Sequence, residues 1–190
     1  MERGPAVGCL LMAAGNAERF GENKLLAEIG GRTLIERAMA AIPREAFARV
    51  LVVTQHDEIM ALAARFGFEA LRNPRPERGQ SETVRLGTAA LARDCGAICY
   101  MVADQPLLER ETVAREAALY RANPECIVGL GHNGVRGNPC IFPELLSLEG
   151  DAGGSAVIKR HLDDLLLFEA SEAELRDVDT KASLEALKER

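Results

Sequence analysis

A short connection near the amino terminus gathers residue types that bind phosphate. It runs from Ala14 to Lys24 and contains Gly15, Arg19 and Gly21. Glycine lets backbone N–H groups approach an anion closely, the Arg19 guanidinium is a planar fork that matches phosphate oxygens, and the Lys24 ammonium is a point charge. Together they could hold a triphosphate and neutralise charge on a leaving pyrophosphate. The alternative is an ordinary strand-to-helix turn with surface charges.

The spacing of the glycines excludes two common phosphate-binding motifs. A Walker loop has four residues between its glycines and a lysine directly after the second, whereas Gly15 and Gly21 are separated by five residues and followed by Glu22. A dinucleotide fingerprint needs G-x-G-x-x-G, and the residues after Gly15 do not match it. The loop therefore predicts phosphate binding of another kind.

Acidic residues in two further segments could hold a divalent cation. Asp104 directly follows an apolar stretch, and Asp177 and Asp179 are spaced so that they face one side of a short strand. Carboxylate oxygens are ligands that Mg²⁺ prefers, so Asp104 and one of the other two could form a metal site. It stays open which of the two completes it. Asp104 could instead form a turn, and Asp179 could cap a helix.

Other polar segments give weaker signals. The segment 72–85 carries four arginines against two glutamates, which suits either an anion beside a helix that Ser81 caps or a solvated loop. The glycine-rich loop 150–155 could contact a second substrate or be a plain loop. The three histidines have no ligand spacing, and no Ser-His-Asp or Cys-His order predicts a covalent nucleophile.

Strands alternating with helices must position these residues. Apolar runs predict strands, and periodic segments with capping residues predict helices between them. This alternation predicts an α/β fold in three layers, a mostly parallel sheet with helices on both faces, whose ligand lies at the carboxyl ends of the strands. The strands are expected at 7–13, 50–54, 68–71, 98–103, 126–130, 140–142, 165–168 and 176–178, and the helices at 33–42, 57–66, 81–93, 111–121, 155–161 and from 180 onward.

Composition limits the class of protein and its partners. The chain has 190 residues, 47% hydrophobic and 27% charged, which fits one globular domain. A net charge of −6 argues against a nucleic-acid partner, because phosphate backbones need a basic face. The amino terminus does not read as a signal peptide, and no apolar run would span a bilayer. Five cysteines without a C-x-x-C pair are expected to be buried thiols in a reducing cytoplasm.

The order of motifs resembles one family. The stretch from Leu11 to Leu25 resembles the signature of sugar-nucleotide-type nucleotidyltransferases, and within them it is most similar to the MobA-like molybdenum cofactor cytidylyltransferases. This likeness spans nearly the whole chain, which is then one MobA-like NTP transferase domain over residues 1–190. Its further matches, in chain order, are Asn73-Pro74, 79–87, 102–106, 137–143, 150–153 and 177–180.

The resemblance implies a Rossmann-like nucleotidyltransferase fold and an activity. CMP would pass from CTP to the terminal phosphate of molybdenum-loaded molybdopterin, with Mg²⁺, or Mn²⁺ in its place, as cofactor. Lys24, Arg19 and Asp104 would carry catalysis. The nucleotide would be bound by Ala13, Ala14, Gly15, Arg19, Lys24, Gln80 and Ser81, and the metal by Asp104 and Asp179. Ala14 stands where the related guanylyltransferases tend to carry a second glycine, which favours CTP over GTP.

The sequence departs from the family on the acceptor side. Gly154 to Ala156 stand where the family often has an arginine, Asn138 where histidine is common, and Lys181 where proline is usual. Two other interpretations therefore stay open: a nucleotidyltransferase that uses GTP or another NTP on a different phosphorylated acceptor, and a non-catalytic nucleotide- or cofactor-binding chaperone. A molybdoenzyme or a cofactor chaperone would be the protein partner, with no nucleic acid and no membrane involved.

Overall fold

The computed structural model describes residues 5–15, 23–143 and 158–188. The predicted phosphate ligand Arg19, with Gly21, lies outside these residues. So do the acceptor-side loop 150–155 and the predicted start of the helix 155–161, of which 158–160 are described and helical.

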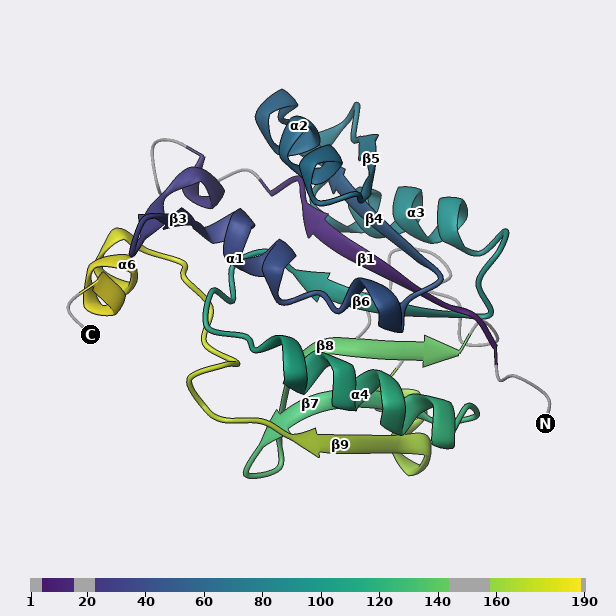
Figure 1. The fold of residues 1–190 in the computed structure, drawn as a ribbon. Helices are drawn as coiled ribbons and strands as arrows, with labels where there is room; N and C mark the ends of the chain where they lie inside the picture. Colours follow the sequence, from purple (N-terminus) through teal and green to yellow (C-terminus); the bar gives the residue numbers. More distant parts are fainter. Residues whose placement is uncertain (1–4, 16–22, 144–157, 189–190) are drawn as a thin grey trace.

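One seven-stranded sheet forms the middle of the molecule (Figure 1). Four strands run parallel at one side of it, and the strand after them is antiparallel to both of its neighbours. Met12 pairs with Val102, so the carboxyl ends of the two central parallel strands lie level. In spatial order the strands are β5 (Glu69–Arg72), β4 (Arg49–Thr54), β1 (Val7–Ala13), β6 (Ala97–Val102), β8 (Val135–Pro143), β7 (Ile127–His132) and β9 (Leu165–Glu169).

Helices cover both faces of this sheet, which confirms the predicted three-layer α/β fold. Side chains of α1 (Leu34–Ala40), α2 (Asp57–Arg65) and α4 (Arg110–Ala122) pack with one face in the larger core cluster. The opposite face packs with α3 (Gln80–Leu91). The structure also has short 3-10 turns, at Lys24–Leu26, Arg44–Ala46, Pro76–Arg78 and Leu162–Asp164.

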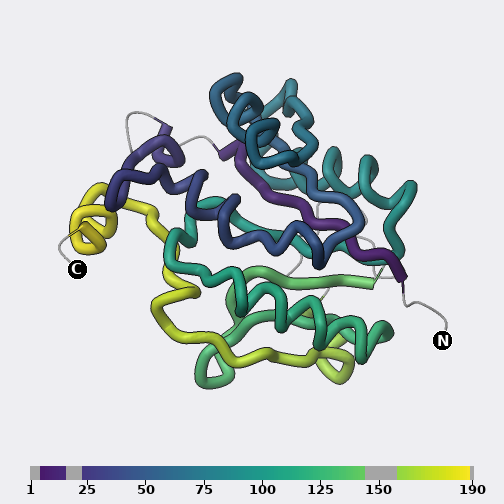
Figure 2. The backbone as a smooth tube through the Cα atoms, viewed as in Figure 1, coloured from purple at the N-terminus to yellow at the C-terminus, as the bar shows by residue number. Residues whose placement is uncertain are grey.

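The carboxyl-terminal part of the chain returns to the amino-terminal half (Figure 2). After β9 it passes to α6 (Lys181–Lys188), which packs near a two-stranded hairpin of β2 (Glu28–Ile29) and β3 (Arg32–Thr33). Val178, on the way to α6, is fully buried in a small cluster with residues of this hairpin and of α1. This return brings the acidic residues after Arg176 to the same end of the sheet as Lys24 and Asp104.

Local sequence accounts for how two of the helices begin and pack. Thr33 and Glu36 form the predicted capping box, in which the Glu36 backbone N–H donates to the Thr33 hydroxyl and the Glu36 carboxylate accepts from the Thr33 N–H. Gly87 lets α3 lie directly on β1, because a Cβ at this position would come within 2.3 Å of a Leu10 methyl. The first feature fixes the start of α1, and the second sets the distance between α3 and the sheet.

Two predictions about local structure are wrong. Ser81 does not cap α3: the helix begins at Gln80 after Gly79, whose φ of 76° ends the preceding turn, and the Ser81 hydroxyl donates to the Arg78 carbonyl. The segment 176–178 forms no strand, because the Val178 N–H donates to the carbonyl of Asp104, which lies beyond the end of β6. The β2–β3 hairpin was not predicted from the sequence.

The described residues contain no helix that is long and apolar enough to cross a membrane. All five cysteines are free thiols, and Cys9, Cys99 and Cys140 are buried as predicted, as is Cys95. Cys126 was expected to be buried as well but is only partly buried.

Candidate active site

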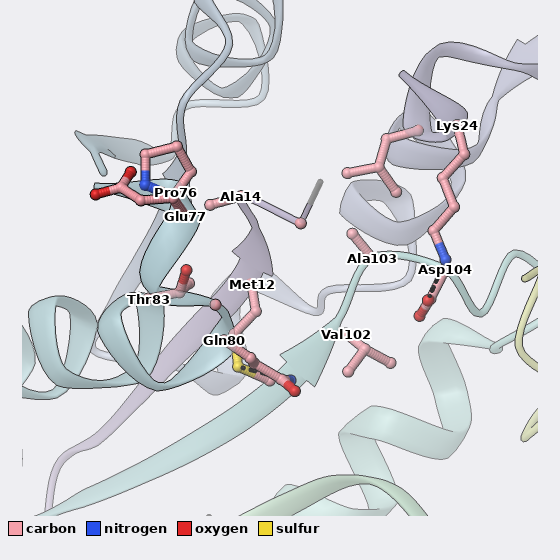
Figure 3. Close-up of a pocket in the computed structure, with 13 residues that line it drawn as sticks. Met12, Ala14, Lys24, Pro76, Glu77, Gln80, Thr83, Val102, Ala103 and Asp104 are labelled. Atoms are coloured by element: carbon pink, nitrogen blue, oxygen red, sulfur yellow. Dashed lines mark hydrogen bonds and ion pairs between the residues drawn. The ribbon is translucent and has the colours of Figure 1, made fainter. Parts of the chain in front are cut away.

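A pocket of about 460 Å³ opens where β1 and β6 end (Figure 3). The end of β1 contributes Met12, Ala14 and Gly15 to its lining, and the start of α3 contributes Gln80. Lys24 and Asp104 form another part of the wall. The pocket therefore lies at the carboxyl ends of parallel strands, where ligands of α/β folds bind.

Lys24 joins two acidic residues that are distant in sequence. Its Nζ donates to Asp104 Oδ2 at 2.8 Å, to Asp179 Oδ1 at 3.3 Å and to the Val178 carbonyl at 3.1 Å. A 3-10 turn that begins at Lys24 presents the side chain, and the Asn23 carboxamide oxygen caps that turn by accepting from the Leu25 N–H. Three segments of the chain thus meet at one ammonium group.

The neighbouring carboxylates keep Lys24 charged. Burial lowers its pKa, but the hydrogen bonds and negative charges of Asp104 and Asp179 outweigh this and raise the pKa above its ordinary value. The side chains of Lys24 and Asp104 are 20% and 22% exposed, whereas that of Asp179 is 69% exposed. The positive charge is therefore fixed at the pocket wall at neutral pH, within reach of an anion in the pocket.

Asp177 makes a different contact from Asp179. Its Oδ1 accepts from Gln105 Nε2 at 3.0 Å, and burial raises its pKa, with a further increase from the charge of Asp104. The prediction that Asp177 and Asp179 face one side rested on a strand that does not form. Asp179 is the residue that shares a cation with Asp104.

The residues Asp104 and Asp179 fit a divalent cation. The Lys24 ammonium shows that one positive charge can contact both carboxylates. Within the described part of the chain no group of three or more acidic, His or Cys side chains could hold a metal by itself. Mg²⁺ commonly takes one or two carboxylates and completes its shell with water and substrate phosphates, so two carboxylates at the pocket wall are enough protein ligands for it.

The side of the pocket opposite Lys24 is formed by the segment before α3 and by its first turn. Gln80 Nε2 lies 3.6 Å from Met12 Sδ at the pocket wall (Figure 3). Asn73 is buried and ties the segment to α3, because its Nδ2 donates to the Thr83 hydroxyl at 3.1 Å. Ser81 is exposed and does not line the pocket, so the structure places only Gln80 of the predicted base-side pair there.

Acidic residues offset most of the positive charge of the segment 72–85. Arg75 and Arg85 both pair with Glu82, which is 4% exposed, and Arg72 pairs with Asp57. The arginine hydrogen bond is the main cause that lowers the pKa of Glu82, so this carboxylate stays charged. The segment is held as a structured wall by these pairs.

A family model matches residues 9–165, most of the chain, and describes the MobA-like NTP transferase domain. The chain belongs to the MobA-like NTP transferase domain family. This confirms the family level of the resemblance, while the match does not distinguish the molybdenum cofactor enzymes within it.

Named relatives extend this result. The chain is 34% identical over 110 residues to the bifunctional protein GlmU of Rhizorhabdus wittichii, a match that covers 56% of this chain and 24% of that protein. It resembles the structure of CMP:2-keto-3-deoxy-manno-octonic acid synthetase complexed with CTP, with a TM-score of 0.76, 13% identity and 97% of each chain covered. A Mycobacterium tuberculosis protein in complex with manganese gives a TM-score of 0.70 at 20% identity, with 97% and 98% covered. The two structural matches show the shared fold.

Of the residues predicted for the site, the pocket is lined by Ala14, Gly15, Lys24, Gln80 and Asp104, but several other residues at or beside it were not predicted. Met12 and Val102 were visible only as apolar strand residues, although both line the pocket. The Val178 carbonyl was not predictable, because a backbone acceptor leaves no mark in the sequence. Gln105 lies between Asp104 and Pro106, and only the aspartate of this motif was predicted to act in the site.

Proposed function

We propose that this chain transfers CMP from CTP to the terminal phosphate of molybdenum-loaded molybdopterin and releases pyrophosphate. The observation that carries the proposal is the placement of Lys24 between Asp104 and Asp179 at the wall of a pocket at the strand ends. Membership of the MobA-like NTP transferase domain family supports nucleotidyl transfer, and the ordered motifs that resemble the molybdenum cofactor cytidylyltransferases support this acceptor.

In the reaction, a terminal phosphate oxygen of the acceptor attacks the α-phosphorus of CTP. A new P–O bond forms, the bond between the α-phosphorus and the bridging oxygen breaks, and that electron pair leaves with pyrophosphate. The protein forms no covalent bond, so its residues act by positioning the substrates and neutralising charge. Lys24, together with Arg19, is the cation that stabilises the growing negative charge on the leaving group.

Asp104 and Asp179 would hold Mg²⁺ beside the nucleotide phosphates. When bound, the ion polarises phosphate oxygens and offsets their negative charge. The manganese complex of the Mycobacterium tuberculosis relative supports a divalent ion in this fold. The chain's own contribution is the pair of carboxylates, which both contact the Lys24 ammonium in this structure.

Ala14 and the base-side wall support CTP as the donor. Ala14 is 4% exposed and lines the pocket, at the position where a second glycine would favour GTP by family resemblance. The synthetase structure with CTP shows that a protein of this fold takes this nucleotide. Gln80 would contact the base from the first turn of α3.

The name of one structural relative favours a second candidate acceptor. The synthetase is named for a sugar acid, so nucleotidyl transfer to a sugar-type acceptor, such as a phosphorylated sugar, is the alternative within the same chemistry. If the acceptor is the molybdenum cofactor, a molybdoenzyme or a cofactor chaperone would receive the product. The middle of β8 lies beside the carboxyl end of β6, where Cys140 pairs with Tyr100, and it offers a surface for the acceptor at this end of the sheet.

The test is a matrix of pyrophosphate-release assays. The full chain with Mg²⁺ is given each nucleoside triphosphate in turn, with molybdenum-loaded molybdopterin or with a panel of phosphorylated sugars. We expect release only with CTP and the pterin, and we expect Asp104→Ala to abolish it. Release by Asp104→Ala at the wild-type rate would refute the site. CTP binding without turnover on any acceptor would favour the non-catalytic chaperone.

A further inference from the structure

Gln105 connects the end of β6 to the carboxyl-terminal acidic segment. Its side chain is 3% exposed, and its Nε2 donates to the Leu175 carbonyl at 3.2 Å and to Asp177 Oδ1 at 3.0 Å. Both partners are acceptors, so the orientation of the amide is fixed by chemistry: only the NH₂ group can face them. One side chain therefore holds a segment that follows it by seventy residues.

This segment also packs through Leu175 against the core and through the buried Val178 in a smaller cluster. It forms no strand with the sheet, and its backbone is anchored by the bond from the Val178 N–H to the Asp104 carbonyl at 2.9 Å and by Lys24 at the Val178 carbonyl. Asp179 follows directly and is mostly exposed. Its position beside Asp104 thus depends on how firmly residues 175–178 are held.

The oxygen atom of the Gln105 amide indicates the role of this residue. Its Oε1 is buried and has no hydrogen-bond partner within the described ranges. A buried polar atom without a partner is unfavourable for stability. An apolar side chain of the same length would avoid this cost but would leave the Leu175 carbonyl and the Asp177 carboxylate without this donor, so the amide serves to hold these two acceptors.

We propose that Gln105 is the positioning residue of the carboxylate pair: by holding the Leu175 carbonyl and Asp177, it keeps Asp179 beside Asp104 for a shared divalent cation. The proposal rests on the proposed function, because it deepens the same site. Gln105 itself touches neither nucleotide nor metal in this role. It acts only through the segment 175–179.

Two substitutions of nearly equal size separate positioning from packing. Gln105→Glu keeps the shape but puts a negative charge against the Leu175 carbonyl and the Asp177 carboxylate, so it pushes the segment away. Gln105→Met removes both donors without repulsion. Asn123→Ala is the matched control, because Asn123 also donates from a side-chain amide to a backbone carbonyl, that of Leu119, on α4.

The first measurement is Mn²⁺ binding to the nucleotide-free chain by electron paramagnetic resonance, with thermal unfolding recorded for every variant. Loss of an outer partner of a metal ligand typically weakens metal binding about 10- to 100-fold. We expect Gln105→Glu to weaken Mn²⁺ binding by at least about tenfold, Gln105→Met less, and the control not at all. Gln105→Met should unfold within a few degrees of the wild type.

The second measurement is steady-state pyrophosphate release at saturating metal. We expect kcat to fall in the order control, Gln105→Met, Gln105→Glu, while KM for CTP stays within about twofold, because the nucleotide side of the pocket is untouched. The proposal would be overturned if Gln105→Glu bound Mn²⁺ as tightly as the control does. It would also be overturned if the loss of Mn²⁺ affinity in Gln105→Met were explained by its loss of stability alone. If the wild type releases no pyrophosphate, the proposed function fails, but the binding series still tests Gln105.

Discussion

Replacing Lys24 with methionine should have opposite effects on metal affinity and on turnover. The substitution keeps the length of the side chain and removes the charge that Asp104 and Asp179 share at 2.8 and 3.3 Å. The ammonium competes with a divalent ion for these two carboxylates when no nucleotide is present. It also stabilises the leaving group when the nucleotide is bound. Lys24→Met should therefore bind metal more tightly and turn over more slowly than the wild type.

The distances set the size of the first effect. In water, unit charges at these two separations attract by about 1.5 and about 1.3 kcal/mol. Salt screens the mostly exposed Asp179 and reduces the sum, so we expect Mn²⁺ binding to the nucleotide-free chain to tighten by about tenfold. Loss of one preorganised charge at a transition state typically costs about 10²- to 10³-fold in kcat, which we expect for pyrophosphate release.

Both effects are measured on the same samples. Mn²⁺ binding is followed by electron paramagnetic resonance and turnover by pyrophosphate release. Lys188→Met is the control, because Lys188 forms an ion pair with Glu185 at 2.8 Å on α6 and leaves the pocket unchanged. If Lys24→Met bound Mn²⁺ more weakly than the control, Lys24 would be supporting the two carboxylates rather than competing with the metal, and the reasoning would be wrong.

Three further substitutions test the core and the base side. Glu116 on α4 is fully buried, both its oxygens lack partners among the described residues, and burial raises its pKa well above the usual value. The folded state keeps this proton where the unfolded chain loses it above about pH 4.3, so between that pH and the raised pKa of the folded state, stability should fall by about 1.4 kcal/mol per pH unit. Glu116→Met should remove this slope in urea unfolding and exceed the wild type in stability at pH 7; parallel curves would contradict the assignment. Gly87→Ala would place a Cβ 2.3 Å from a Leu10 methyl and should lower the free energy of unfolding by about 1–3 kcal/mol, despite the better helix propensity of alanine. Gln80→Leu should raise KM for the nucleotide and leave kcat unchanged, whereas an unchanged KM would remove Gln80 from the base side.

The strands of the main sheet could be predicted approximately, because buried strands form apolar runs in the sequence. Val7–Ala13 was predicted at its observed bounds, and the capping box at Thr33 and Glu36 fixed the start of α1. These features depend on neighbouring residues only. The start of α3 was missed by one residue, because Gly79 with its positive φ ends the preceding turn and Ser81 is already in the helix.

The arrangement of the acidic residues could not be predicted in the same way. Period two placed Asp177 and Asp179 on one side, which holds only inside a strand. The actual path of this segment is set by contacts with Asp104, Gln105 and Lys24, all of which lie far away in sequence. No local pattern encodes such a path.

Asp104 and Asp179 are accordingly held in place by different parts of the fold. Asp104 lies two residues beyond β6, which pairs with β1 along all six of its residues and with β8 along four of them, so the sheet itself fixes it. Asp179 has no strand behind it and depends on a buried Val178, a backbone bond and the Gln105 amide. A change in the carboxyl-terminal segment can therefore move one ligand of the pair without disturbing the sheet. Variation in metal affinity should accordingly follow residues 105 and 174–180 more closely than residues of the core.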